Sequence, residues 1–299
     1  MALAAIGGVT MTFASPMRRP SATQNEAGPS ALAVLLHSSA SSGSQWKSLT
    51  GWLAPSLHVM TPDLPGYGTA AGLDDGEDDV LADAGPVIAL IEQAGAAAHL
   101  VGHSYGGVVA LAIAMARPEL VRSLTLIEPV AFYLLRNGDA DDRRLLREVT
   151  SVEARIRAAM ELGAPEIGMA RFIDFWNGEG SWARLEPARQ IHLCRQIHRV
   201  AANFAAIAQE PCTLAPLRAI RRPTLIIRGE QSPGCTRRIA GMLEAAIPSA
   251  RLAEIPNAGH MAPLTHPHYV DPLVADHIFA ARQRHMADLQ RVGAANFRY

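Results

Sequence analysis

The strongest structural signal in this chain is the segment His99-Leu-Val-Gly-His-Ser-Tyr-Gly-Gly-Val108, where an apolar run ends in one serine flanked by glycines. Within it, Gly102-His-Ser-Tyr-Gly106 fits the pattern Gly-x-Ser-x-Gly. Residues 96–101 are apolar as in a short strand, and the Ala-rich run 108–116 is typical of a buried helix. The glycines allow a sharp strand-to-helix turn, which would project the Ser104 hydroxyl outward as a candidate nucleophile. This context favours a strand–turn–helix unit over an incidental Gly/Ser turn.

Alternating strand and helix patterns surround this segment. Strands are predicted at 31–36, 57–61, 97–101 and 123–127, with helices at 80–93 and 106–117, and a possible opening strand at 9–14. Later in the chain, strands at 223–228 and 250–255 and helices at 236–246 and 270–290 continue the alternation. Such a pattern predicts an α/β fold with crossover connections, a largely parallel sheet and ligands at the carboxyl ends of its strands. Ser104 follows one of these ends.

Residues 131–217 interrupt the alternation. They show no strand pattern and predict several helices rich in Arg, Ala and Leu. We therefore expect a core domain built from residues 1–130 and 218–299, with 131–217 as a helical insertion. For any one aromatic residue there, packing inside the insertion is a better expectation than contact with substrate. The candidates to line a substrate pocket are Phe132, Tyr133, Phe172, Trp176 and Trp182.

Composition narrows the class of function. The 299 residues are 49% hydrophobic and 18% charged, with a formal net charge of −1, which argues against disorder and against nucleic acid as a partner. The three cysteines, Cys194, Cys212 and Cys235, form no C-x-x-C pair and predict neither a disulfide framework nor a thiolate zinc site. No run approaches the ~18 apolar residues of a membrane span, and the basic pair Arg18-Arg19 follows the first apolar stretch instead of preceding it. We expect a cytoplasmic protein without a membrane partner, acting on a small molecule; a homo-oligomer remains open.

Two clusters that resemble metal sites have simpler interpretations. The acidic run at residues 74–79 directly precedes a predicted helix, where carboxylates favour the positive end of the helix dipole. His266 and His268 match no zinc spacing, and Pro267 between them breaks any helical face. Neither a G-x-G-x-x-G dinucleotide fingerprint nor a P-loop is present. We expect no metal site.

In these motifs, and in their order, the sequence resembles the α/β-hydrolase superfamily over about residues 31–283. The motifs are His37-Ser-Ser39 after the first strand, Asp63-Leu-Pro-Gly-Tyr-Gly68, the segment Gly102-His-Ser-Tyr-Gly-Gly107, and Asn257-Ala-Gly-His260 after the last strand. The resemblance implies a doubly wound, mostly parallel sheet with a helical cap at 131–217. It also implies an enzyme without a cofactor.

A serine hydroxyl needs a base within hydrogen-bond reach and an acid that orients the base. The resemblance implies Ser104 as nucleophile and His260 as base, while His103 in the turn is expected to point away from the serine. The acid departs from the common pattern, because Ser232 stands where most members place an aspartate. Glu128, in Leu126-Ile-Glu-Pro129, is our choice of acid, as in some relatives. Glu230 is its main rival, and a purely structural Glu128 at a strand end is the third option.

The resemblance further implies an oxyanion hole made by the backbone N–H groups of Ser39 and Tyr105. The predicted activity is hydrolysis of a small or medium carboxylic ester, with the cap holding an apolar part of the substrate. Amidase, thioesterase, carbon–carbon bond hydrolase and perhydrolase chemistry use the same residues and remain alternatives. A catalytically silent ligand receptor is another, favoured by the missing aspartate after Gly229.

Overall fold

A computed structural model describes residues 31–70, 79–211 and 213–296. Their strands form one six-stranded sheet in the order β2-β1-β3-β4-β5-β6, with every neighbouring pair parallel. The strands are β1 (Leu32–Leu36), β2 (His58–Met60), β3 (Ala98–His103), β4 (Val121–Ile127), β5 (Thr224–Gly229) and β6 (Ala250–Ile255). The predicted α/β fold is confirmed, and each of these strands falls on a predicted run. The possible opening strand at 9–14 lies outside the described residues.

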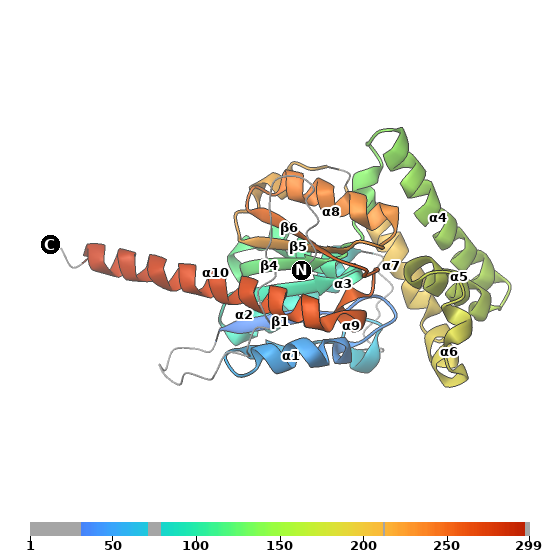
Figure 1. The fold of residues 1–299 in the computed structure, drawn as a ribbon, viewed down its shortest axis with the longest axis horizontal. Coiled ribbons are helices and arrows are strands. Elements are labelled where there is room, and N and C mark those ends of the chain that lie inside the picture. The colour runs from blue at the N-terminus through green and yellow to red at the C-terminus, as the bar shows by residue number, and fades with distance from the viewer. Residues whose placement is uncertain (1–30, 71–78, 212, 297–299) are drawn as a thin grey trace, which may run out of the picture.

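Helices cover both faces of the sheet (Figure 1). The face that presents Leu35, Val101 and Ile127 packs against α1 (Lys47–Leu53) and α10 (Pro267–Asn296). The alternate side chains of the same strands, such as Val34 and Leu100, pack against α2 (Val80–Ala94), α3 (Tyr105–Ala116) and α8 (Gly234–Ala246). Successive side chains of a strand point to opposite faces, so a strand buried on both faces favours apolar residues throughout, as in β1.

The insertion between β4 and β5 is helical. Its α-helices are α4 (Ala140–Glu161), α5 (Pro165–Asn177), α6 (Pro187–Cys194) and α7 (Ile197–Gln209). Figure 1 shows them gathered beyond one end of the sheet. Ion pairs join this insertion to the core: the buried pair of Arg199 with Asp83, and the pairs of Arg238 with Asp142 at 2.6 Å and with Asp139 at 4.0 Å.

The structure agrees with the interpretation of the acidic run as the start of a helix. Asp79 is the N-cap of α2, where its side chain accepts a hydrogen bond from the Leu81 N–H at 2.7 Å. Residues 74–78 of that run lie outside the described residues.

Of the three cysteines, Cys212 lies outside the described residues, and Cys194 and Cys235 are free thiols. Within the described ranges, no helix is both long enough and apolar enough to cross a bilayer.

Candidate active site

Ser104 lies in a strained turn between β3 and α3. Its backbone has φ 56° and ψ −117°, outside the regions that L-residues usually adopt. A Cβ on Gly102 would come 2.2 Å from the carbonyl oxygen of Gly106, and one on Gly106 would come 2.5 Å from that of His37. Only glycine therefore fits at either position. The Ser104 N–H is anchored on the carbonyl of Ile127, at 2.9 Å, which fixes the turn to the end of β4.

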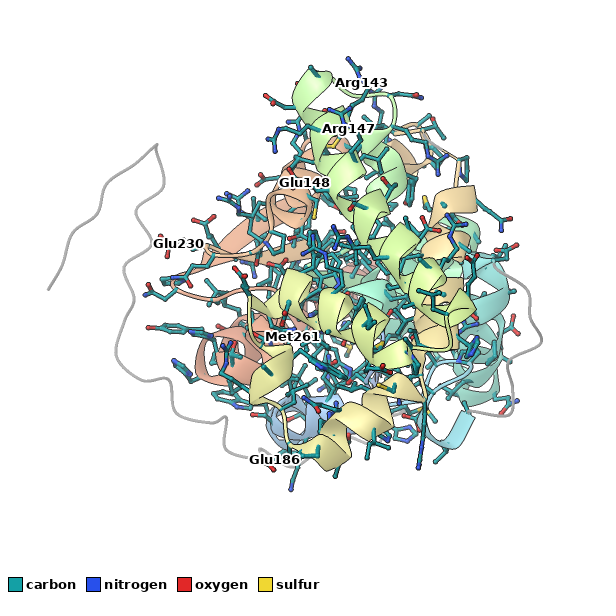
Figure 2. All side chains as sticks on the ribbon, turned by 90° about the vertical axis from the view of Figure 1, so that its right-hand side faces the viewer. Arg143, Arg147, Glu148, Glu186, Glu230 and Met261 are labelled. Atoms are coloured by element: carbon teal, nitrogen blue, oxygen red, sulfur yellow. The ribbon has the colours of Figure 1, made fainter. Side chains whose placement is uncertain are left out.

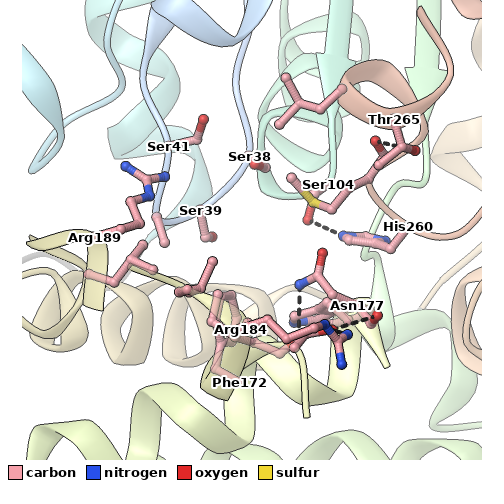
Figure 3. A pocket seen from close by; sticks show the side chains of 18 residues that line it. Ser38, Ser39, Ser41, Ser104, Phe172, Asn177, Arg184, Arg189, His260 and Thr265 are labelled. Carbon is pink, nitrogen blue, oxygen red and sulfur yellow. Dashed lines mark hydrogen bonds between the residues drawn. The ribbon is translucent and has the colours of Figure 1, made fainter. Parts of the chain in front are cut away.

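Three side chains from different strand ends form a hydrogen-bonded chain. Ser104 Oγ lies 3.0 Å from His260 Nε2, and His260 Nδ1 lies 3.3 Å from Glu128 Oε2. Figure 3 shows the first of these contacts at the edge of the pocket. Ser104, His260 and Glu128 are 6%, 2% and 0% exposed. Because β3, β4 and β6 are parallel, their carboxyl ends meet at one edge of the sheet, which brings these three side chains together.

Glu128 is held by more than its contact with His260. Its Oε1 accepts a hydrogen bond from the Gly229 N–H at 2.5 Å and another from Ser232 Oγ at 2.6 Å. Burial alone raises the pKa of this carboxyl, but the hydrogen bonds from His260, Ser232 and Gly229 outweigh it and leave the pKa below its ordinary value. Glu128 is therefore ionised at neutral pH, with one oxygen directed at the imidazole.

The rival Glu230 takes a different position. It is exposed, and its Oε2 accepts a hydrogen bond from the Asn257 N–H at 2.8 Å. Figure 2 shows it at the outer edge of the molecule. Ser232, at the usual aspartate position, instead donates to Glu128. A glutamate after β4 and a serine after β5 are thus hydrogen-bonded to each other beside His260.

The other two histidines near Ser104 are structural. His103 points away from the serine, as predicted: its Nε2 donates to the His260 carbonyl at 2.9 Å, and its Nδ1 accepts from Gln45 Nε2 at 3.1 Å. Complete burial lowers the pKa of His103 to about 3, so its ring is neutral. The ring of His37 accepts from the Leu64 N–H at 2.9 Å and donates to the Ser38 carbonyl at 2.8 Å.

Ser39 and Tyr105 flank the Ser104 hydroxyl, and a network from the insertion holds both side chains. Ser39 Oγ donates to Asn203 Oδ1 at 2.8 Å, which also accepts from Tyr67. The Tyr105 hydroxyl and Arg199 both donate to the same oxygen of buried Asp83.

Asn203 and Arg199 are one helical turn apart on α7, so a single helix anchors both loops. Sequence reasoning missed these residues and Gln45. No local pattern marks them, because Asn203 is 164 positions from Ser39 and Arg199 is 116 from Asp83.

Within the described residues, two cavities border Ser104. The larger, of about 410 Å³, is lined by the candidate aromatics Phe172 and Trp176 and by His260. The smaller, of about 20 Å³, lies against Phe132 and the same two aromatics. Trp182 instead lines a separate cavity next to α6, and Tyr133 is buried without lining either cavity at Ser104. The Trp176 ring stacks on that of His260, with 4.3 Å between centroids and 29° between planes.

No three His, Cys, Asp or Glu side chains within the described ranges come together where they could hold a metal ion. The candidate site therefore consists of the Ser104–His260–Glu128 chain, the two loops beside it and the two cavities.

Residues 33–272 match the α/β-hydrolase family. The chain belongs to this family. It is 27% identical over 267 residues to a pimeloyl-[acyl-carrier protein] methyl ester esterase from Aromatoleum aromaticum, covering 81% of this chain and 96% of that protein. It is also 29% identical over 186 residues to the polyketide synthase ThaQ of Burkholderia thailandensis, but this match covers 60% of this chain and 8% of that protein.

Among solved structures, MenH from S. aureus superposes with a TM-score of 0.70 at 20% identity, covering 85% of this chain and 96% of that one. At this identity the superposition shows a shared fold. Together with the family match, it confirms the expected α/β-hydrolase architecture.

Proposed function

We propose that this chain is a serine hydrolase that cleaves a small or medium carboxylic ester through an acyl-enzyme intermediate. The observation that carries the proposal is the buried hydrogen-bonded chain from Ser104 through His260 to Glu128. The similarity to a protein named a methyl ester esterase supports an ester as substrate.

In the first half of the reaction, Ser104 Oγ attacks the ester carbonyl while His260 Nε2 takes its proton. The Nδ1–H of His260 stays directed at Glu128, whose negative charge stabilises the imidazolium. His260 then gives the proton to the leaving alkoxide, and the carbon–oxygen bond breaks. In the second half, His260 deprotonates a water molecule that attacks the acyl-enzyme, and Ser104 recovers its proton as the carboxylic acid leaves.

The oxyanion that forms in each half needs donors aimed at it, and the backbone N–H groups of Ser39 and Tyr105 serve as this oxyanion hole. In the described part of the chain, neither amide donates a hydrogen bond to another protein group. Tyr105 is also the first residue of α3, where the helix dipole favours negative charge. The network from α7 holds these loops, and the insertion acts as a cap over the pocket.

The test is turnover of p-nitrophenyl acetate combined with covalent labelling by a fluorophosphonate. Wild-type protein should hydrolyse the ester and incorporate one phosphonyl group per chain, on Ser104. Ser104→Ala should lose both, while its thermal unfolding stays that of the wild type. A folded wild-type protein that is not labelled would contradict the proposal and favour the silent receptor.

A further inference from the structure

Two cavities meet at Ser104, and only one of them reaches His260. The larger cavity is lined by Ser104, Ser39 and His260. The smaller cavity, which we call the niche, is lined by Ser104 and Ser39 but not by His260. The two halves of an ester bound to Ser104 must occupy different spaces, so this asymmetry sets the orientation of the substrate.

The orientation rests on the proposed function. His260 must protonate the leaving oxygen, so the alcohol half has to lie where Nε2 can reach it. That places the alcohol half in the larger cavity and leaves the niche for the acyl half. We infer that the substrate is a short-chain ester, acetyl above all, of an alcohol or phenol that carries a carboxylate or phosphate group.

The size of the niche limits the acyl group. Its volume is about 20 Å³, enough for one water-sized group. Apart from Ser39 and Ser104, one polar side chain and six apolar ones, all buried, form its walls: Asn203, Val130, Phe132, Phe172, Trp176, Phe204 and Ile207. A methyl group fits this space, and each further methylene has to displace close-packed side chains.

The charged side chains that line the larger cavity indicate which chemical group the alcohol half of the substrate carries. Its lining contains Arg184 and Arg189 but no Asp or Glu side chain. Figure 3 shows both arginines among the side chains of the pocket, contributed by the insertion. Arg184 donates to Ser181 Oγ at 2.7 Å and to the Glu179 carbonyl at 3.5 Å, which ties its guanidinium to the cavity wall. Within the described residues, neither arginine forms a salt bridge with a carboxylate.

Several other arginines of this chain do have such partners: Arg117, Arg144, Arg157, Arg199, Arg228 and Arg238 each lie within salt-bridge distance of a carboxylate. Guanidinium groups offer five N–H donors in a planar fork that matches carboxylate and phosphate oxygens. Two of them without a carboxylate partner, beside apolar Leu185 and Leu193, suit an aromatic or aliphatic body that ends in an anion. The products would be acetate and a free hydroxy acid or hydroxyaryl phosphate.

The first experiment tests the anion. We would compare kcat/KM for 4-acetoxybenzoate, 4-acetoxyphenyl phosphate and the neutral 4-acetoxybenzamide, each corrected for its rate of alkaline hydrolysis. We expect the wild type to prefer one or both anions by about 10- to 100-fold, because charged hydrogen bonds are the stronger ones. The ratio between the two anions identifies which oxyanion the arginines hold.

Arg184→Gln/Arg189→Gln should abolish that preference, so that the ratio of kcat/KM for the anions to kcat/KM for the benzamide falls to about one. Arg195→Gln is the matched control, because Arg195 is exposed at the end of α6 and lines a different cavity. An unchanged preference in the double variant, or no preference in the wild type, would overturn the anion inference. A wild type that hydrolyses the benzamide equally well would still support the proposed esterase function.

The second experiment tests the niche, using p-nitrophenyl acetate, butyrate and octanoate. We expect kcat/KM to fall by at least tenfold from acetate to butyrate. Ile207→Ala, which enlarges the niche, should narrow that gap, whereas Ile173→Ala in the larger cavity should not. A wild-type optimum at octanoate would overturn the orientation. Absence of turnover on every ester, with no fluorophosphonate labelling, would instead contradict the proposed function itself.

Discussion

Ser104 and His260, on the sheet side of the larger cavity, are 6% and 2% exposed, whereas Arg184 and Arg189, on the insertion side, are exposed to solvent. The sheet side is held by backbone geometry and buried hydrogen bonds. The residues on the insertion side are positioned by individual helices and by contacts between side chains. Proton transfer depends on distances that strand ends can fix, while recognition of a substrate tolerates more variation.

The largest effect should come from the acid on the sheet side. In Glu128→Gln, the donors Gly229 and Ser232 hold the amide oxygen, so the NH₂ group faces His260 Nδ1 and forces the wrong tautomer. We expect kcat/KM for p-nitrophenyl acetate to fall by about 10²- to 10⁴-fold with the fold intact. Glu230→Gln should stay within about twofold of wild type. The reverse ranking would assign the acid to Glu230.

A similar free energy should be lost where the insertion packs against the core, but here it is the free energy of unfolding. Arg199→Met leaves the Asp83 carboxylate buried without its guanidinium partner, which typically costs about 3–5 kcal/mol. Urea unfolding followed by circular dichroism measures this. Arg195→Met should be nearly neutral, and adding Asp83→Asn to Arg199→Met should restore part of the loss. Equal stability of the two single variants would contradict a structural role for the buried pair.

Trp176 tests how far the insertion contributes to the chemistry. Its ring stacks on His260, and aromatic pairs of this kind contribute about 0.5–1.5 kcal/mol. Trp176→Leu should therefore lower kcat by about two- to tenfold, since the imidazole loses a contact that orients it. Trp182→Leu, in the separate cavity, should leave kcat unchanged. A change in KM alone would limit Trp176 to substrate binding.

The smallest effect should come from the ion pair between α4 and α8, in which the Asp142 side chain is buried and Arg238 is half exposed. Hydrogen bonds from Arg238 are the main cause that lowers the pKa of Asp142 below its ordinary value. A lowered carboxyl pKa stabilises the fold above the unfolded-state pKa, and this contribution is lost as pH falls through the folded-state pKa. Arg238→Gln should thus lower stability by about 0.2–1 kcal/mol at pH 7 and by nothing at strongly acidic pH. Thermal unfolding across that pH range measures the difference, and a pH-independent effect would contradict an ionic contribution.

Much of the fold could be predicted because it depends on short-range patterns. Apolar runs of five or six residues and the Gly-x-Ser-x-Gly segment identify β3, its turn and α3 without reference to the rest of the chain. The cavity that Trp182 lines could not be predicted, for the opposite reason: an aromatic residue of the insertion can face either of two cavities, and nothing local distinguishes them.

The order of residues was by itself enough to place Ser104, Glu128 and His260 at strand ends, because strand and turn signals are local and parallel strands end at a common edge. The contacts of Glu128 required the tertiary structure, since Gly229 and Ser232 lie more than 100 positions from the carboxylate to which they donate. The same holds for the anchoring of Ser39 and Tyr105 by α7, and for the two cavities. These features depend on which distant side chains fill the same space, and packing of that kind has no signature in the neighbouring sequence.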